Sequence, residues 1–149
     1  MTPTPSPRAP APKDLAQIHA RCFPAHPRAW SAGEIAALTD RRGSFLLTRP
    51  AGFLIGRVIA DEAELLTLAV APEARRQGRG RQLLHEFQAK AAAMGAAEGF
   101  LEVASDNPAA LALYLSQGWQ RAGLRRNYYA PGVDALILHH RFTASHEIG

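Results

Sequence analysis

The spacing of hydrophobic positions changes several times along this chain, and the changes predict a series of helices and strands. Residues 14–22 carry apolar side chains at helical spacing, and we expect Asp14 to cap this short helix. Prolines at positions 24 and 27 then predict a loop of the kind that often contacts substrates. Ser31 and Glu34 have the spacing of a capping box, which predicts a second helix over residues 32–39.

From residue 44 onward the pattern is that of strands. Residues 45–48 and 53–60 predict an antiparallel hairpin around the turn at 49–52. Residues 64–70 are almost continuously apolar, which predicts a strand covered on both faces.

In the second half of the chain, patterns typical of helices and of strands follow one another. Helical spacing over residues 82–94 ends at Gly95, and residues 99–104 form the next predicted strand. Asn107 followed by proline predicts a helix N-cap, with a short helix over 109–116 and an antiparallel strand pair over 119–126 and 134–141.

These elements predict a single-domain α/β (α+β) fold whose mixed, mostly antiparallel sheet is flanked by helices. A length of 149 residues fits one domain, and 47% hydrophobic residues are enough for a core. We expect residues 1–12, with five prolines, to be a flexible lead-in, residues 13–142 to be the domain, and residues 143–149 to be a tail.

Positive charge comes almost wholly from arginine. The chain carries 17 Lys+Arg against 13 Asp+Glu, a net charge of +4, and its only lysines are Lys13 and Lys90. The planar guanidinium of arginine matches phosphate oxygens better than an ammonium group does. A basic balance also fits contact with nucleic acid or ribosomes, but net charge alone specifies no partner.

Cys22 is the single cysteine, so no intrachain disulfide can form, which fits a reducing compartment. No apolar run reaches the ~20 residues needed to span a bilayer, and the N-terminus lacks the apolar core of a signal peptide. We therefore expect a cytoplasmic protein. The six histidines show no ligand spacing, and we predict no metal.

A turn rich in arginine and glycine connects the apolar strand to the following helix. It consists of Arg75, Arg76, Gln77, Gly78, Arg79, Gly80 and Arg81. A strand, a glycine turn and a helix start present free backbone N–H groups at one point, which suits a phosphate or pyrophosphate. No Gly-Lys-Ser/Thr follows, which excludes a P-loop, and Leu83 stands where a dinucleotide turn needs glycine. On pattern alone, a tight turn with solvent-facing arginines is an equal alternative.

The element order and this turn resemble the GCN5-related N-acetyltransferase (GNAT) superfamily, whose turn pattern is Gln/Arg-x-x-Gly-x-Gly/Ala. The resemblance implies that residues 75–81 hold the pyrophosphate of acetyl-CoA. It also implies that the backbone of Leu68, Ala69 and Val70 lies along the pantetheine arm. Asn107 would add a side-chain contact to the cofactor besides capping its helix.

A narrower resemblance, over residues 14–142, is to the bacterial RimI-like enzymes, which acetylate the N-terminal alanine of a small-subunit ribosomal protein. It is carried by Leu101-Glu102-Val103, by Asn107 with Leu113-Tyr114 and Gly118-Trp119, and by Arg125-Arg126-Asn127-Tyr128-Tyr129. The resemblance implies that Glu102 is the general base and Tyr114 the general acid. Without it, strand alternation would simply place Glu102 in water, and Tyr114 would be an ordinary core residue.

The resemblance also implies a substrate groove formed by Arg126, Asn127, Tyr128 and Tyr129, with Phe23 and Trp30 on the other wall. In the family a Phe-Pro often stands close to a Trp, whereas here Pro24 and Trp30 are separated by five residues. This departure leaves the acceptor open: other protein N-termini, a lysine or a small amine remain alternatives, as does a silent acyl-CoA-binding module. Because Cys22 has no feature that lowers a thiol pKa, we expect direct transfer in a ternary complex. We expect a monomer or weak dimer without nucleic-acid readout.

Overall fold

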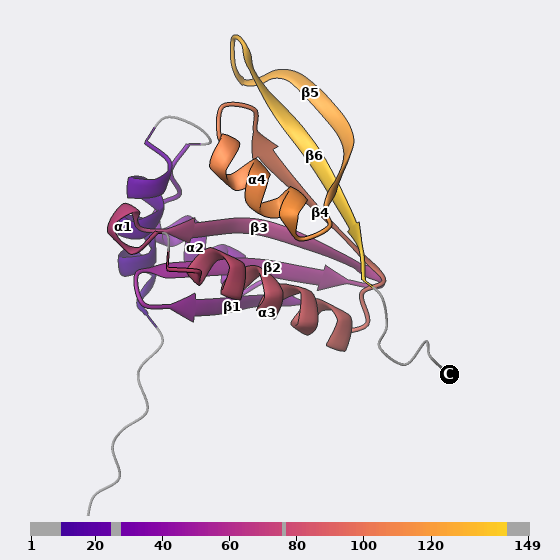
Figure 1. The fold of residues 1–149 in the computed structure, drawn as a ribbon. Coiled ribbons are helices and arrows are strands. Elements are labelled where there is room, and N and C mark those ends of the chain that lie inside the picture. Colours follow the sequence, from indigo (N-terminus) through magenta and orange to yellow (C-terminus); the bar gives the residue numbers. More distant parts are fainter. Residues whose placement is uncertain (1–9, 25–27, 76, 143–149) are drawn as a thin grey trace, which may run out of the picture.

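The computed structural model describes residues 10–24, 28–75 and 77–142. The predicted order of helices and strands is confirmed (Figure 1). The elements are α1 (Pro12–Cys22), α2 (Ala32–Thr39), β1 (Ser44–Arg49), β2 (Gly52–Ile59), β3 (Glu62–Val70), the 3₁₀ turn η1 (Pro72–Ala74), α3 (Arg79–Ala93), β4 (Glu98–Ala104), α4 (Pro108–Ser116), β5 (Gln120–Ala130) and β6 (Val133–Arg141). The predicted tail at 143–149 and most of the predicted lead-in, residues 1–9, lie outside the described residues.

Local capping explains where the first two helices begin. The predicted Asp14 cap of α1 is wrong, because the helix starts at Pro12 with Ala11 as its N-cap and no side-chain cap. Proline suits the first helical position, since its fixed φ is already helical and its missing N–H is not needed there. The capping box of α2 is confirmed: Glu34 N–H donates to Ser31 Oγ at 3.1 Å, and Ser31 N–H donates to a Glu34 oxygen at 3.0 Å.

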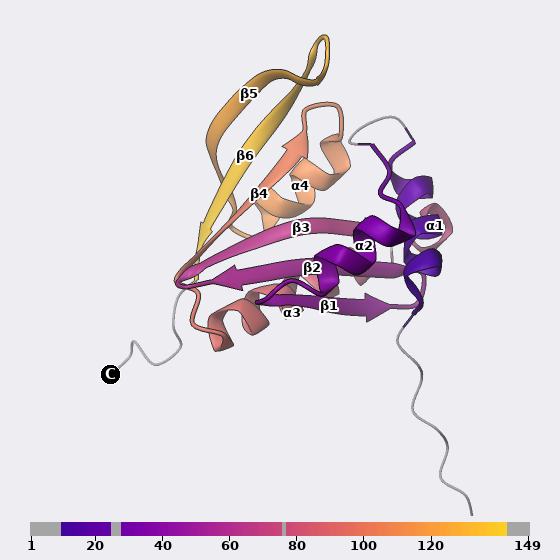
Figure 2. The ribbon, with the colours of Figure 1, turned by 180° about the vertical axis from the view of Figure 1, so that it is seen from behind.

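The six strands form one sheet in the order β1-β2-β3-β4-β6-β5, and only the β3–β4 pairing is parallel. Helices α1 and α2 cover one face of the sheet, and α3 covers the other (Figures 1 and 2). The result is a three-layered domain. In the part of the chain that the structure describes, no helix is long and apolar enough to cross a membrane.

Strand β3 contains a bulge where it pairs with β2. Ile55 pairs with Thr67 and Gly56 pairs with Leu65, so Leu66 is an extra residue on β3. A bulge bends its strand and moves later side chains to the opposite face. Leu65 accordingly packs into one core cluster, whereas Ala69, four residues later, packs into the other.

The two clusters lie on opposite faces of the sheet and confirm that β3 is covered on both sides. The larger cluster joins α3 and α4 to the sheet through Phe87, Tyr114 and Trp119. The smaller joins α1 and α2 to it through Leu15 and Ile35.

Beyond the bulge, β3 and β4 separate. The two strands pair only through residues 62–64 and 98–100. In Figure 1 they start together and fan apart, β3 toward the α1 end and β4 toward the β5–β6 hairpin. The sheet is therefore split at its centre, and over residues 65–70 the edge of β3 that faces β4 has no strand partner in the described part of the chain.

Candidate active site

A cavity of about 610 Å³ lies between the separated strands β3 and β4. Its volume is within the range of small-molecule sites. Several of the predicted site residues line it: Phe23, Trp30, Leu68, Glu102, Asn107, Tyr114, Tyr128 and Tyr129. These residues come from six different segments of the chain, and only the fold brings them together.

Glu102 reaches the cavity from β4. Its neighbours Leu101 and Val103 are buried in the α3/α4 core, so strand alternation turns Glu102 toward the opposite face, where its side chain is 34% exposed. Arg125 of β5 lies beside it, with Nη2 3.5 Å from Glu102 Oε1. A partly exposed carboxylate beside a cleft is able to accept a proton from a bound amine.

Tyr114 enters the same cavity from the other face of the sheet. It lies on α4, and Asn107 caps that helix as predicted, because its Oδ1 accepts from Ala110 N–H at 3.2 Å. The tyrosine is only 6% exposed and packs edge-on against Trp119 at 6.2 Å between ring centroids. Burial raises the pKa of Tyr114, which keeps the phenol protonated, and no described residue hydrogen-bonds to its hydroxyl.

The glycine turn leads into α3 beside this cavity. Gly78 is the N-cap of α3 and adopts a left-handed conformation with φ of 76°, which a residue with a Cβ would reach only with strain. A Cβ on Gly80 would stand 3.4 Å from Leu113 Cδ2, so this glycine lets α3 approach α4 closely. The first N–H groups of α3 have no partner within the helix, an arrangement that suits the binding of an anion.

The remaining residues of the glycine turn lie in different environments. Arg76 lies outside the described residues. The Nε of Arg75 donates to the carbonyl of Val70 at 3.0 Å, so part of this side chain braces the end of β3. Gln77 and Arg81 are exposed, and Arg79 is half-buried.

The end of β3 is also held by α1. The thiol of Cys22 lies 3.2 Å from the carbonyl of Val70, and Arg21 forms an ion pair with Glu73 in η1. Burial raises the pKa of the Cys22 thiol, which disfavours the thiolate that a nucleophile needs. Cys22 is therefore placed to brace the strand.

The β5–β6 hairpin forms the outer wall of the cavity. Its strands lose register between Arg125 and Ala130, and Tyr128 and Tyr129 stand in this irregular stretch with their rings edge-on at 5.2 Å. Burial and the nearby Glu102 raise the pKa of Tyr129 to about 12. Tyr129 is therefore neutral near pH 7. Both tyrosines present an apolar ring with a polar hydroxyl to the cavity.

Two residues predicted for this groove do not line it. Asn127 has a φ of 52°, its Oδ1 accepts from Gly132 N–H at 2.8 Å, and its own N–H donates to Asp134 at 2.8 Å. Its side chain therefore shapes the hairpin. Arg126 is exposed and is not among the cavity residues.

Four charged or aromatic residues of the cavity were not predicted as site residues. His19, Glu64, Phe100 and Arg125 line it. Glu64 and Phe100 pair across the last bonded positions of β3 and β4, so they stand where the strands begin to separate. Arg125 belongs to the Arg-Arg-Asn-Tyr-Tyr run, and an alternating pattern cannot tell which of its two arginines faces inward. Among the described residues, no group of His, Cys, Asp and Glu could hold a metal ion.

This arrangement suits acyl transfer. A carboxylate and a protonated phenol meet in one cleft from opposite faces of the sheet, as a base and an acid would. The open edge of β3 offers backbone hydrogen bonds to an extended arm, and the start of α3 offers an anion site next to that edge.

Comparison with known proteins agrees with this chemistry. A [Ribosomal protein bS18]-alanine N-acetyltransferase of Escherichia coli strain K12 is 42% identical over 121 residues, which cover 76% of this chain and 82% of that protein. An N-alpha-acetyltransferase RimI of Mycobacterium tuberculosis is 46% identical over 88 residues, 56% of this chain and 52% of that protein.

Solved structures and a family model extend the comparison. The crystal structure of the Escherichia coli ribosomal-protein-S18-alanine N-acetyltransferase superposes with a TM-score of 0.78 at 35% identity, covering 91% of this chain and 90% of that one. Ard1 from Thermoplasma volcanium has the same fold, with a TM-score of 0.78 at 23% identity over 92% of this chain and 97% of that one. The model of the acetyltransferase (GNAT) family matches residues 12–119. The chain therefore belongs to the GNAT family and is an acetyl-CoA-dependent N-acetyltransferase.

Proposed function

We propose that this enzyme transfers the acetyl group of acetyl-CoA to the N-terminal alanine of a small-subunit ribosomal protein. The observation that carries the proposal is the meeting of Glu102 and Tyr114 in one cleft. The identity of 42% to an enzyme named for acetylation of alanine on ribosomal protein bS18 supports the choice of acceptor.

The donor is proposed to enter from the α3/α4 face. The pyrophosphate would rest on the N–H groups at the start of α3, where Gly78 turns the chain without a side chain in the way. The turn that leads to this point carries four arginines, Arg75, Arg76, Arg79 and Arg81, and the neutral Gln77. The pantetheine arm would follow the unpaired edge of β3 along Leu68, Ala69 and Val70, with Asn107 and Tyr114 on its other side.

Glu102 is proposed to prepare the acceptor. An α-amino group has a pKa of ~8, so most of it is protonated at neutral pH and cannot attack a carbonyl. Glu102 removes one proton, directly or through a water, and the neutral nitrogen forms a bond to the thioester carbon. The nitrogen loses its second proton to solvent as the tetrahedral intermediate collapses to the amide, and Glu102 also releases its proton to solvent. A backbone N–H of residues 68–70 stabilises the oxyanion that develops.

Tyr114 is proposed to complete the transfer. As the carbon–sulfur bond breaks, the phenol gives its proton to the departing thiolate, and solvent returns a proton to the tyrosine. The raised pKa of Tyr114 keeps the phenol protonated at neutral pH but makes the transfer to the thiolate uphill, so the hydroxyl must be aimed at the sulfur as the bond breaks. The amide and free CoA leave, and no metal takes part. The raised pKa of the Cys22 thiol favours this direct route over an acyl-cysteine intermediate.

The acceptor peptide is proposed to lie on the α1/α2 face. Phe23 and Trp30 would form one wall and Tyr128 and Tyr129 the other. Asn127 would help to shape the hairpin that carries the two tyrosines. A ribosomal acceptor places the reaction in the cytoplasm. We propose that the enzyme acts as a monomer or weak dimer and reads no nucleic acid directly.

Mass spectrometry of acetylation reactions tests the proposal. The acceptors are an Ala-starting peptide from a small-subunit ribosomal protein, the same peptide with a blocked N-terminus and an internal lysine, and spermidine. We expect rapid acetylation of the first peptide alone. Transfer to spermidine or to the blocked peptide, without transfer to the free N-terminus, would refute the proposed acceptor.

A further inference from the structure

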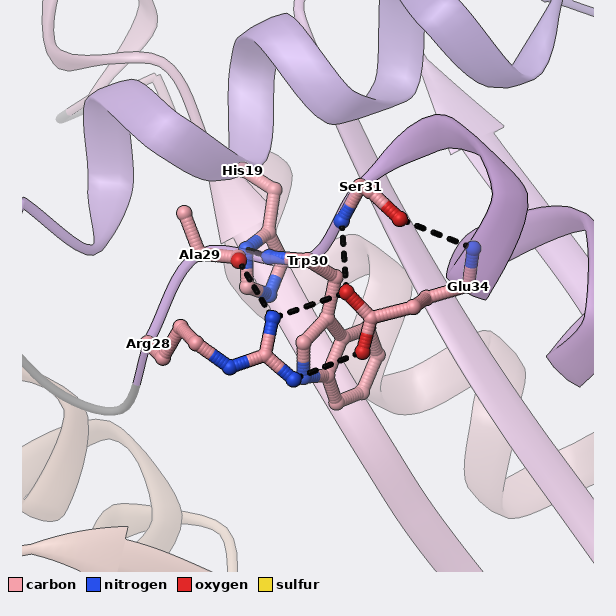
Figure 3. Close-up of polar contacts among 6 residues, drawn as sticks. All are labelled: His19, Arg28, Ala29, Trp30, Ser31 and Glu34. Atoms are coloured by element: carbon pink, nitrogen blue, oxygen red, sulfur yellow. Dashed lines mark hydrogen bonds and ion pairs between the residues drawn. The ribbon is translucent and has the colours of Figure 1, made fainter.

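His19 joins helix α1 to one wall of the proposed acceptor site. Its Nδ1 accepts a hydrogen bond from the backbone N–H of Trp30 at 3.1 Å, and its ring is stacked on the indole at 4.8 Å with an interplanar angle of 15°. The ring of Phe23 lies 4.5 Å away on another side. His19, Phe23 and Trp30 all line the cavity. Figure 3 shows His19 beside Trp30.

The hydrogen bond determines the state of the imidazole. A backbone N–H donates to Nδ1, so Nδ1 carries no hydrogen and the neutral ring holds its proton on Nε2. The histidine is 0% exposed, and burial lowers its pKa to about 4, which keeps the ring neutral near pH 7. In the described part of the chain, the buried Nε2 has no hydrogen-bond partner.

An unsatisfied buried donor is unfavourable, and an apolar ring of similar size would avoid it. That apolar ring would instead leave the Trp30 N–H without an acceptor. The structure therefore keeps an imidazole where simple core packing would favour phenylalanine. The advantage of the imidazole over a phenyl ring is that its Nδ1 holds the backbone N–H of Trp30.

An ion pair between Arg28 and Glu34 also holds the residues around Trp30 in place. Arg28 donates to both oxygens of Glu34, at 2.8 and 2.7 Å, and Glu34 also accepts the N–H of Ser31 (Figure 3). Arg28 holds the pKa of Glu34 down at about 2, so the pair stays charged. Residues 28–31 are thus fixed to the start of α2, while His19 fixes the indole between them to α1.

We propose that His19 is a positioning residue for the acceptor: its neutral imidazole holds Trp30 and Phe23 as a preformed wall of the acceptor cavity. A wall that is already in place loses less entropy when the peptide binds, so acceptor affinity rises. His19 does not touch the reacting atoms and acts through Trp30. The inference rests on the proposed function, because it assumes that the acceptor lies between Trp30 and the tyrosines.

Two variants separate the hydrogen bond between His19 and Trp30 from the stacking of their rings. His19→Phe keeps an aromatic ring but removes the acceptor atom, and His19→Asn keeps an acceptor near the Nδ1 position but removes the ring. Leu15→Ala is the matched control, because Leu15 is also buried on α1, in the core cluster against which Phe23 and Trp30 pack, but does not line the cavity. It reports what a weakened α1 does by itself.

The first measurement is hydrogen exchange at the Trp30 amide. In His19→Phe this amide should exchange roughly threefold to tenfold faster than in the wild type, the effect of losing one hydrogen bond. His19→Asn should restore most of the protection. Equal protection of the Trp30 amide in wild type and His19→Phe would overturn the inference without involving activity.

Steady-state kinetics with the Ala-starting peptide provide the second measurement. We expect His19→Phe to raise the peptide KM roughly threefold to tenfold and to leave kcat and the acetyl-CoA KM within about twofold. His19→Asn should lie closer to the wild type, and Leu15→Ala should leave the peptide KM unchanged. An unchanged peptide KM in His19→Phe, or an equal rise in Leu15→Ala, would refute the positioning role. If the wild type acetylates no peptide at all, the proposed function fails instead.

Discussion

The guanidinium of Arg125 lies against the carboxylate of Glu102, with Nη2 3.5 Å from Oε1, and also faces the ring of Tyr128 at 5.3 Å from its centroid. The three groups line one cavity. If Glu102 takes a proton from the acceptor, the acceptor ammonium must reach the carboxylate that Arg125 already contacts. Arg125 therefore competes with the acceptor for Glu102.

Replacing Arg125 tests this competition. We expect Arg125→Met to lower the acceptor KM by about threefold, because the variant keeps an apolar stem against Tyr128 and removes a charge that repels the ammonium. The decrease in the acceptor KM should become smaller as the salt concentration rises, because salt screens the repulsion. Arg126→Met is the control, since Arg126 does not line the cavity. A higher KM in Arg125→Met would mean that this arginine binds the acceptor.

Replacing Glu102 tests the general base. Glu102→Gln should lower kcat by roughly 10²–10⁴-fold at neutral pH, the usual contribution of a positioned base. The loss should become smaller as pH rises toward the amine pKa of ~8, because the amine then loses its proton to solvent. The measurement is a pH–rate profile with the Ala-starting peptide, and a wild-type profile for the variant would remove Glu102 from the mechanism.

Tyr114→Phe should lower kcat by about 10²-fold and leave the acetyl-CoA KM nearly unchanged. The free energy of unfolding should change little, because no described residue bonds to the lost hydroxyl. Since burial raises the pKa of Tyr114 above its usual value, the wild type should show no alkaline loss of activity from this group below pH ~10. An unchanged kcat in Tyr114→Phe would exclude the tyrosine as the acid.

Gly78→Ala tests the pyrophosphate site. Gly78 and Gly95 lie just outside opposite ends of α3, both have positive φ, and a Cβ on either would meet nothing within 4 Å. Alanine at either position should therefore lower the free energy of unfolding by a similar ~1 kcal/mol of backbone strain. Only Gly78→Ala should weaken acetyl-CoA binding in calorimetry. Equal affinities in both variants would contradict the assignment.

The lowered pKa of His19 predicts how stability depends on pH. The unfolded histidine titrates near pH 6.5, whereas the folded one, buried and facing both Glu34 and Arg28, titrates near pH 4. Between these values the unfolded chain binds the extra proton, so the free energy of unfolding falls as pH drops from about 6.5 to 4. In urea titrations across this range, His19→Phe should lack this part of the fall, and Leu15→Ala should retain it.

The amino-acid sequence by itself determined the helices, strands and turns of this protein, because capping, alternation and turn formation depend on neighbouring residues. The capping box at Ser31 and the cap at Asn107 were predicted for this reason. The Asp14 cap failed because a proline at position 12 offered an earlier start of the helix. Resemblance to a family then indicated Glu102 and Tyr114.

Only the tertiary structure decided how the site is assembled. β3 bulges at Leu66 and pairs with β4 only through residues 62–64, which leaves room for the cavity, and nothing in a continuous apolar run marks where that bulge falls. The contacts of Arg125 with Glu102 and of His19 with Trp30 join residues that line the same cavity but belong to different segments of the chain. Such contacts depend on how the sheet splits and how the helices pack across it. Local sequence patterns cannot specify them, because they describe only how each segment folds.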